Sequence, residues 1–409
     1  MLSSQSAVLI RATLPAVGGA IGEITPLFYR RLFAAHPELL RDLFNRGNQA
    51  TGTQQQALAG SIAAFATMLV EHPEQRPDAM LSRIAHKHAS LGIRREQYPI
   101  VQEHLFAAIV EVLGAAVTPE VAAAWDEVYW LMANALIALE DRLRTQAEAT
   151  AGPATGAQAA AGHWRSWRVI GRQQETAEVV SFLVRPVDGG PLPTVRPGQY
   201  VSVQVELPDG ARQIRQYSLS GQSDEALRFT VKREAGTPGP AGEVSAFLHR
   251  HAQVDSELRL SPPFGDVHLD EAGEGPVLLV SAGIGCTPMI GMLGHLAATG
   301  STRKVITAHA DRTEQSHAFR SELAQLTEKL AAAEAHVWYE QPADPDWPAE
   351  RTGLIDLTAL ELPAGTTAYL CGPLPFLRAA RSQLLTAGLP ASAIHYEVFG
   401  PDLWLATTV

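Results

Sequence analysis

Two histidines, His86 and His88, lie two residues apart in the stretch IAHKHASLGI, in a chain with 14 histidines. The stretch has a helical pattern, in which successive residues turn by about 100°, so side chains two apart point to opposite sides. One metal ion therefore cannot bind both. Leu81, Ile84 and Ala85 form an apolar stripe that His88 continues, whereas His86 lies off the stripe and is predicted to be solvated. His88 is thus either a hydrogen-bonded core histidine or a single metal ligand.

A carboxylate and a phenol elsewhere in the chain favour a ligand role for His88. Glu140 lies between Leu136 and Leu143 in the apolar stripe of another helix, and Tyr98 opens the helix after His88. A buried carboxylate is costly unless it is paired. A metal-bound histidine usually donates its second ring N–H to a carboxylate or carbonyl. The sequence therefore predicts a group of His88, Glu140 and Tyr98, and the alternative is that Glu140 reaches solvent at a helix end.

The elements that carry these residues belong to an all-helical region, residues 1–148. Apolar residues recur there at spacings of three and four, and Thr118-Pro119 has the pattern of a helix start. The sequence AEATAGPATGAQAAAG follows, with small residues and no stripe, and predicts a linker over 149–162. The first domain is therefore predicted to be all-α.

Two further regions have different patterns. Residues 163–270 alternate apolar and polar side chains, as in 201–207 and 227–232, which predicts antiparallel strands that close into a small barrel. Residues 271–409 alternate short apolar strands with helices, predicted at 289–298, 317–332 and 374–387, which indicates an α/β domain with a parallel sheet. Ligands bind such sheets at the carboxyl ends of the strands.

Composition excludes several classes of protein. A length of 409 residues fits about two to three domains, and 46% hydrophobic residues suffice for a core in each. A net charge of −11 disfavours non-specific binding to nucleic acid or anionic membrane. No uninterrupted apolar run reaches the ~18 residues of a membrane helix, so no stable membrane insertion is predicted. Two cysteines and no signal-peptide pattern favour a cytoplasmic protein with reduced thiols.

The helical region resembles a globin, and specifically the globin domain of flavohaemoglobins. The segment LFYRRLFAAHPELLRDLF, the segment IAHKH and the triplet EQY at 96–98 carry this resemblance. It implies that His88 is the proximal haem ligand, hydrogen-bonded by Glu140 and Tyr98. It also implies a set of haem-pocket residues: the distal Tyr29, Gln54 and Leu58, and the haem-wedging Phe44. Alternatively, Tyr29 is an ordinary core tyrosine. Lys87 is expected to be solvated, or else to affect the iron potential by its charge.

The barrel region carries the motif Arg215-Gln216-Tyr217-Ser218, preceded by PGQY, which ends at Tyr200, and followed by VKRE. Arg215 and Tyr217 share a strand face because they lie two residues apart. Together these segments resemble the FAD-binding barrel of ferredoxin-NADP reductases, and Gly242–Ser245 resembles its pyrophosphate loop. The arginine would clamp the pyrophosphate, and an aromatic residue would pack on the flavin. Cross-strand packing is the alternative for the two tyrosines.

The last region carries a glycine-rich turn between a strand and a helix. Its residues match the G-x-G-x-T-P pattern of the same reductases: Gly283, Ile284, Gly285, Cys286, Thr287 and Pro288. Glycines allow close backbone approach, and a helix N-terminus binds phosphate. Cys371 matches a cysteine beside the nicotinamide, with a buried structural thiol as the alternative. The segment YEVFGP resembles the part that closes over the flavin: Glu397, between flavin and haem, then Val398, Phe399, Gly400 and Pro401.

The order of globin, FAD barrel and NAD(P) domain is that of flavohaemoglobins over essentially the whole chain. The resemblance implies haem b, FAD and NAD(P)H as cofactors. It implies nitric oxide dioxygenase activity, in which electrons pass from NAD(P)H through FAD to haem and NO and O2 become nitrate. The alternatives are an NAD(P)H-dependent haem or flavin oxidase-reductase, and a globin-based gas sensor. A monomer is expected. The sequence leaves open NADH against NADPH, lipid in the haem pocket, and the role of the tail 402–409.

Overall fold

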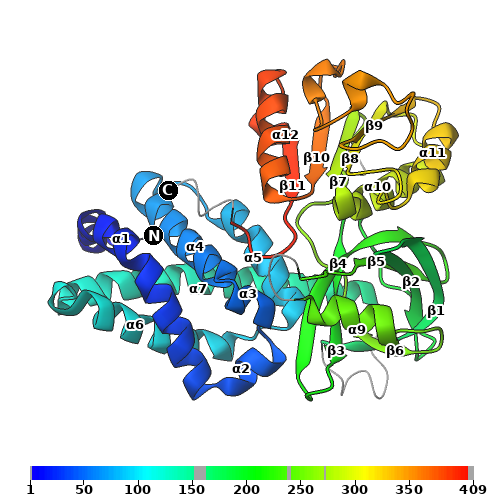
Figure 1. Cartoon of the computed structure of the whole chain (residues 1–409). Coiled ribbons are helices and arrows are strands. Elements are labelled where there is room, and N and C mark those ends of the chain that lie inside the picture. The colour runs from blue at the N-terminus through cyan, green and yellow to red at the C-terminus, as the bar shows by residue number, and fades with distance from the viewer. Residues whose placement is uncertain (1, 152–162, 237–240, 271–272, 404–409) are drawn as a thin grey trace.

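The computed structural model describes residues 2–151, 163–236, 241–270 and 273–403 (Figure 1). The described chain forms a helical domain, a closed barrel and a parallel-sheet domain, in that order. The predicted fold class is therefore confirmed. Most of the predicted linker, 152–162, and the tail 404–409 lie outside the described residues.

The helical domain is built from seven α-helices in the described chain. They are α1 (Ser4–Ala35), α2 (Pro37–Asp42), α3 (Arg46–Ala50), α4 (Thr53–Glu71), α5 (Asp78–Leu91), α6 (Tyr98–Leu113) and α7 (Pro119–Ala151). The predicted start of α7 holds, because Thr118 Oγ1 accepts from Val121 N at 3.3 Å and Pro119 occupies the first turn. Helix α5 ends where Gly92 takes a φ of 74°. His88 therefore lies in the last turn of α5, which packs against α7.

Two segments of this domain are apolar enough over 18 residues to cross a membrane by length and composition. They are Ser4–Ala35 and Arg95–Ala116. Both contribute to the cores of the helical domain, for instance through Ile24 and Leu105, and core helices of globular domains pass the same test. These segments are therefore weak evidence for a membrane span.

The barrel has the strand order β1-β2-β5-β4-β3-β6. Its strands are β1 (Arg165–Thr176), β2 (Val179–Pro186), β3 (Tyr200–Glu206), β4 (Arg212–Gln222), β5 (Leu227–Lys232) and β6 (Glu257–Leu260). Helix α9 (Glu243–His251) inserts Val244 and Leu248 into the barrel core. Closure leaves no free sheet edge, and the alternation predicted for 201–207 and 227–232 is that of β3 and β5.

The third domain is a five-stranded parallel sheet with the order β11-β10-β7-β8-β9. Its strands are β7 (Val277–Ala282), β8 (Val305–Asp311), β9 (Ala333–Tyr339), β10 (Thr367–Cys371) and β11 (Ile394–Glu397). Its helices are α10 (Cys286–Ala298), α11 (Arg320–Lys329) and α12 (Leu374–Thr386). The chain order reverses between β7 and β10, and such a switch point is where open parallel sheets bind ligands.

Helix α11 is shorter than the predicted span of 317–332. It begins after Phe319, which has a φ of 63°, so the preceding residues cannot continue the helix. His317, Ala318 and Phe319 instead form a buried turn. The chain then leaves the helix at Leu330 in an extended conformation and enters β9 three residues before the predicted strand HVWYE.

The three domains meet around helix α5 and the end of the chain. Figure 1 shows α5 beside the barrel and shows the segment after β11 returning from the sheet domain towards the helical domain. Hydrogen bonds join this segment to α5, from Arg83 to Asp402 at 2.7 Å and from Lys87 Nζ to the Gly400 oxygen at 3.0 Å. The helix that bears His88 therefore also carries a contact between domains.

Candidate functional site

The structure brings His88, Tyr98 and Glu140 together inside the helical domain. His88 Nδ1 lies 2.9 Å from Glu140 Oε1 and 3.1 Å from Tyr98 Oη, and Tyr98 donates to the same carboxylate oxygen at 2.6 Å. Glu140 is 0% exposed, so the alternative that it reaches solvent is wrong. A carboxylate beside Nδ1 fixes the proton on that nitrogen, which leaves the Nε2 lone pair free to bind a metal.

The surroundings of His88 fit a haem iron better than a bare metal ion. In the described parts of the chain no hydrogen bond reaches Nε2, and the His88 side chain is 31% exposed although it belongs to the interior stripe of α5. Among the described residues there is no group of three or more His, Cys, Asp and Glu side chains that could hold a metal ion. An ion at Nε2 would therefore need further ligands from a bound group, as haem supplies.

Tyr29, on α1, lies in a buried aromatic cluster. Its ring is stacked on Phe33 at 5.6 Å and meets the edge of Phe44 at 5.8 Å, and it is 5% exposed. The side chains of Gln54 and Gln49 lie beside its hydroxyl group. Burial raises the pKa of Tyr29 well above its usual value, so the hydroxyl keeps its proton at neutral pH. Tyr29 is therefore a hydrogen-bond donor in an apolar pocket, rather than a tyrosine without polar neighbours.

Two further predicted pocket residues, Leu58 and Phe44, are held by different parts of the structure. Leu58, on α4 with Gln54, packs against the same apolar cluster as Tyr29. Phe44 lies between α2 and α3, and its backbone oxygen accepts from Gln213 Nε2 of the barrel at 3.2 Å. Gln213 also donates to the oxygens of Leu40 and Arg41, so this buried amide fixes the end of α2 from the neighbouring domain.

Strand β4 separates its motif onto two faces. Arg215 and Tyr217 lie opposite Val203 and Val201 of β3, whose side chains belong to the barrel core. Tyr217 is stacked on Phe229 at 5.8 Å, so the alternative of packing describes part of its surroundings. Burial lowers the pKa of Arg215, and in the described chain no carboxylate forms an ion pair with it. A buried guanidinium with only neutral acceptors fits the place of an anionic group such as a pyrophosphate.

The other face of β4 points towards the helical domain. Ser218 lies opposite Tyr200, and both are buried, with Tyr200 packed near Ala89 of α5. Gln216 Nε2 donates to Ser202 Oγ at 2.9 Å, and that hydroxyl donates to Ser90 Oγ of α5 at 2.9 Å. The residues of the predicted flavin motif are thus hydrogen-bonded, through one serine, to the helix that carries His88.

The glycine-rich turn lies at the switch point of the parallel sheet. A Cβ on Gly285 would come within 2.2 Å of the Cys371 oxygen, so this glycine permits contact with the end of β10 rather than with a ligand. Gly283 has a φ of 52° and open space beside it, so it is the position that a ligand can approach. Thr287 Oγ1 donates to the Ile284 oxygen at 2.9 Å and closes the turn. Buried Pro288 lies in the first turn of α10.

Both cysteines are buried in this domain. Burial raises the pKa of Cys286 and of Cys371, so both thiols stay protonated at neutral pH. Cys371 ends β10, beside Glu397 of β11 and Ser281 of β7. This position is compatible with the predicted place beside a nicotinamide, and the thiol has the full burial that the structural alternative requires.

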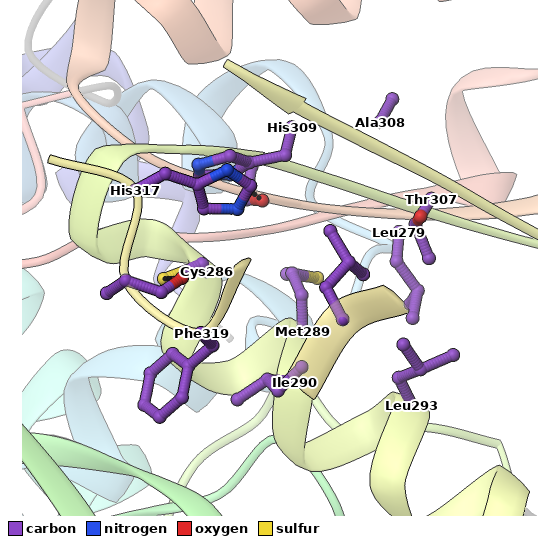
Figure 2. Close-up of a pocket in the computed structure, with 13 residues that line it drawn as sticks. Leu279, Cys286, Met289, Ile290, Leu293, Thr307, Ala308, His309, His317 and Phe319 are labelled. Atoms are coloured by element: carbon purple, nitrogen blue, oxygen red, sulfur yellow. Dashed lines mark hydrogen bonds between the residues drawn. The ribbon is translucent and has the colours of Figure 1, made fainter. Parts of the chain in front are cut away.

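Behind the turn, the sheet domain contains a buried pair of histidines. Figure 2 shows His309 stacked on His317 beside Cys286, with ring centroids 4.0 Å apart. Ser281 Oγ and Asp311 flank His309 at 2.9 Å and 3.6 Å, an arrangement reminiscent of hydrolase triads. The enclosed cavity measures about 20 Å³, which holds about one water and no substrate. The histidine pair therefore lines a small cavity behind the glycine-rich turn.

The buried histidine pair predicts a loss of stability in acid. Burial, followed by the charge of His309, lowers the pKa of His317 from 6.5 to about 2. The unfolded chain therefore binds a proton below pH 6.5 that the folded chain rejects, so stability falls as pH decreases. Between pH 7 and pH 5 this group alone should remove about 2 kcal/mol of unfolding free energy. Urea unfolding at both pH values should show a correspondingly smaller difference for His317→Gln; an equal difference would contradict the prediction.

Two predictions about α5 are wrong. His86 is not solvated, because its Nδ1 accepts from Gly265 N at 3.0 Å and burial lowers its pKa to about 4. Lys87 is half-buried and donates to Gly400, and burial lowers its pKa to about 8. The reason is the same for both, since the side of α5 that faces away from its own domain is covered by the barrel and the C-terminal segment.

The predicted residues of the C-terminal segment differ in how far they are buried. Glu397 is 7% exposed, its Oε2 has no hydrogen-bond partner in the described chain, and burial raises its pKa to about 8. Val398 packs on the sheet domain, whereas Phe399 is 45% exposed. Gly400 has a φ of 107° and precedes half-buried Pro401. Glu397 is therefore a buried carboxyl group at the end of β11, and its place between flavin and haem stays a prediction.

Several residues of the site were not found from the sequence. Gln49 lies beside the hydroxyl of Tyr29, as Gln54 does, and its Nε2 has no hydrogen-bond partner in the described chain. Arg46 pairs with Asp209 at 2.6 Å and Glu243 at 2.7 Å, across the interface with the barrel. Arg83 joins α5 to the C-terminal segment. Only Gln49 had a signal in the sequence, because it belongs to the same polar stretch as Gln54.

The chain is similar to known proteins along its whole length. The globin family pattern matches residues 27–136, and that of the oxidoreductase NAD-binding domain matches 279–382. A protein of Chromobacterium violaceum named flavohemoprotein is 44% identical over 409 residues, which is 98% of this chain and 98% of that protein. A flavohemoprotein of Rhizobium meliloti is 40% identical over 412 residues, covering 99% of this chain and 100% of that protein.

Solved structures agree with these relatives. The flavohemoglobin of Malassezia yamatoensis, solved with bound FAD and heme, has a TM-score of 0.87 and 36% identity. The match covers 98% of this chain and 100% of that chain. The FAD/NAD-binding domain of a nitric oxide dioxygenase from Vibrio cholerae has a TM-score of 0.54 and 37% identity, covering 58% of this chain and 99% of that one.

Proposed function

The chain belongs to the flavohemoprotein family, and from this premise we propose that it is an NAD(P)H-dependent nitric oxide dioxygenase that converts NO and O2 to nitrate. Membership of this family makes the chain an oxidoreductase. The predicted monomeric state and cytoplasmic location stay predictions.

We assign one cofactor to each domain, with haem b in 1–148, FAD in 163–270 and NAD(P)H in 271–409, on either side of the linker 149–162. His88 Nε2 would bind the haem iron, Arg215 would bind the FAD pyrophosphate, and the turn at Gly283 would receive the nicotinamide nucleotide. When bound, NAD(P)H supplies a hydride, FAD converts it to single electrons, and haem iron is reduced to the form that binds O2. The relative from Malassezia yamatoensis, which binds FAD and heme, supports two of these assignments.

The observation that carries the proposal is the buried carboxylate beside the ligand imidazole. Glu140 Oε1 takes hydrogen bonds from both His88 and Tyr98 while shielded from water. A hydrogen bond from Nδ1 to a buried carboxylate gives the imidazole anionic character and makes it a stronger donor to iron. That favours activation of O2 over storage, which supports the dioxygenase reading over a simple oxygen carrier.

The distal residues hold the reacting ligand. Tyr29 keeps its proton and can donate it in a hydrogen bond, and the side chains of Gln54 and Gln49 lie beside the hydroxyl group. The surrounding aromatic rings of Phe33 and Phe44 exclude water, so the donor acts in a medium of low dielectric where its effect is large. Leu58 limits the room in the same cluster. These residues thereby stabilise negative charge that develops on a diatomic ligand.

A direct test is to mix reduced, oxygen-saturated protein with NO in the absence of excess O2 and to measure nitrate. Stoichiometric nitrate is the expected result, and slow or absent nitrate formation would reject the proposal. If steady-state NAD(P)H consumption is unaffected by NO, the oxidase-reductase alternative gains support. Purified protein that cannot bind FAD would favour the gas sensor, which needs no hydride supply.

The role of the proximal carboxylate predicts the effect of Glu140→Gln. The glutamine can still accept from Tyr98 but carries no charge, so the imidazole becomes a weaker donor to iron. Resonance Raman spectra should show a lower Fe–His stretching frequency, and nitrate formation should fall by about tenfold, in the range that partners of metal ligands usually contribute. Asp141→Asn, one residue away on α7 and exposed, serves as the control. An unchanged frequency would remove Glu140 from this role.

A further inference from the structure

Arg83 of α5 makes contacts with all three domains. Its Nη1 donates to Asp402 Oδ2 at 2.7 Å and its Nη2 donates to the Tyr396 oxygen at 2.6 Å. The guanidinium carbon lies 4.5 Å from the centre of the Tyr396 ring, and Nε lies 3.7 Å from Asp266 Oδ2 in the loop after β6. The side chain is 21% exposed. One arginine therefore joins the helix of His88, the barrel and the end of the sheet domain.

The segment that Arg83 holds, Tyr396–Asp402, is called here the C-terminal strap. It starts within β11, where Glu397 lies opposite Cys371 of β10 at the switch point of the sheet. It then crosses to α5, where Lys87 Nζ donates to the Gly400 oxygen. The strap thus begins beside the place assigned to the nicotinamide and ends on the helix that carries the candidate haem ligand. Glu397, the last residue of β11, belongs to this strap.

We propose that Arg83 is a positioning residue for electron transfer from FAD to haem: by holding the C-terminal strap on α5, it sets the distance and orientation between the two cofactor sites. The inference rests on the proposed function, because it assumes that an electron leaves reduced FAD and reduces ferric haem iron. We expect hydride transfer from NAD(P)H to FAD to depend less on Arg83, because its ion pair with Asp402 lies at the α5 end of the strap.

The chemistry of the contact requires arginine. One planar guanidinium with a delocalised charge contacts three groups that lie in different directions. They are the Asp402 carboxylate, the Tyr396 carbonyl and the Tyr396 ring. A lysine at this position would keep the charge but could not donate along both directions while covering the Tyr396 ring. Removing the cation would leave Asp402 and Asp266, both largely buried, without this partner, which favours release of the strap.

The alternative is that Arg83 only holds the domains together. If Arg83 only stabilised the structure, its replacement would lower the unfolding temperature and leave the ratio of flavin reduction to haem reduction unchanged. A positioning role instead separates the steps, because haem reduction slows while flavin reduction does not. The ratio of the two rates is therefore the measurement that distinguishes the roles.

The experiment uses the full-length holoprotein with Arg83→Met, Arg83→Lys and the control Arg76→Met. Arg76 lies just before α5, is 82% exposed and pairs with Asp78, the first residue of that helix. Anaerobic stopped-flow mixing with NAD(P)H follows flavin and haem reduction separately. For R83M we expect haem reduction to fall by at least about tenfold, as small misplacements can cost even more, and flavin reduction to stay within about twofold. R83K should recover only a minor part of the loss, and R76M should match wild type.

Hydrogen exchange of peptides covering 394–403 gives a second readout that does not depend on turnover. Exchange should rise in R83M and stay unchanged in R76M. Haem reduction within about twofold of wild type in R83M, or flavin reduction that falls in parallel, would overturn the proposal, as would unchanged exchange. If R83M does not fold, Tyr396→Leu tests the same contact from the strap side. If wild-type haem is not reduced by NAD(P)H, the proposed function fails, while exchange still decides whether Arg83 holds the strap.

Discussion

Replacing His88 with alanine is expected to abolish the Soret absorption of the purified protein while the flavin bands remain. The variant removes the ring whose Nδ1 is hydrogen-bonded to the buried Glu140 carboxylate and whose Nε2 has no hydrogen bond in the described chain. NO-dependent nitrate formation should fall by more than about a hundredfold, because partners of a metal ligand alone contribute about 10- to 100-fold and the ligand itself contributes more.

The control for this experiment is the neighbouring histidine. His86 lies two residues away on the other side of α5, where it accepts from Gly265 of the barrel. His86→Ala should therefore keep its haem and its Soret band. Added imidazole should restore part of the haem binding of His88→Ala, because the truncated side chain leaves a space of that shape beside Glu140. Full haem content and intact turnover in His88→Ala would contradict the assignment of the ligand.

Local periodicity was enough to predict the proximal group. The spacing of Leu81, Ile84 and Ala85 placed His88 on the interior side of its helix, and the same reasoning placed Glu140 on the interior side of α7. Helical geometry fixes the side of each residue, and burial of a carboxylate demands a partner. The fold class could be predicted for similar reasons, because each domain has its own apolar period over many residues.

Periodicity could not predict what covers the other side of α5. His86 and Lys87 look solvated when only the helix and its own domain are considered, but a second and a third domain cover them. An apolar stripe identifies the side of a helix that packs into the core of its own domain. A helix between two domains has a second buried side, and because that side is polar it leaves no such stripe. Arg83 was missed for the same reason, since an arginine off the stripe has the pattern of a surface residue.

The spacing of residues in the sequence also could not predict contacts between strands. Gly285 was expected to make room for a ligand, yet it makes room for the backbone of Cys371, which lies far along the chain on β10. The order of strands in the sheet creates this contact, and the order is not written in any local pattern. The hydrogen bonds from Gln216 through Ser202 to Ser90 likewise arise only when the barrel meets α5.

A substitution in the predicted distal pocket can remove a single oxygen atom. Tyr29→Phe removes the hydroxyl group but keeps the ring that is stacked on Phe33 and packed against Phe44. Haem binding depends on His88, and flavin reduction takes place in other domains, so neither should change. The substitution thus isolates the hydrogen bond that the Tyr29 hydroxyl can donate. Tyr369→Phe, in the sheet domain, is the matched loss of a tyrosine hydroxyl far from the pocket.

For Tyr29→Phe we expect nitrate formation to fall by about 100-fold, as for the loss of one oriented donor to a developing negative charge. O2 should dissociate faster from the reduced protein, because the hydroxyl that holds it is gone. Stopped-flow measurement of O2 release and of nitrate yield separates binding from reaction. If nitrate forms within about twofold of the Tyr369→Phe rate, the hydroxyl does not stabilise the reacting ligand, and Gln49 or Gln54 would have to supply the donor instead.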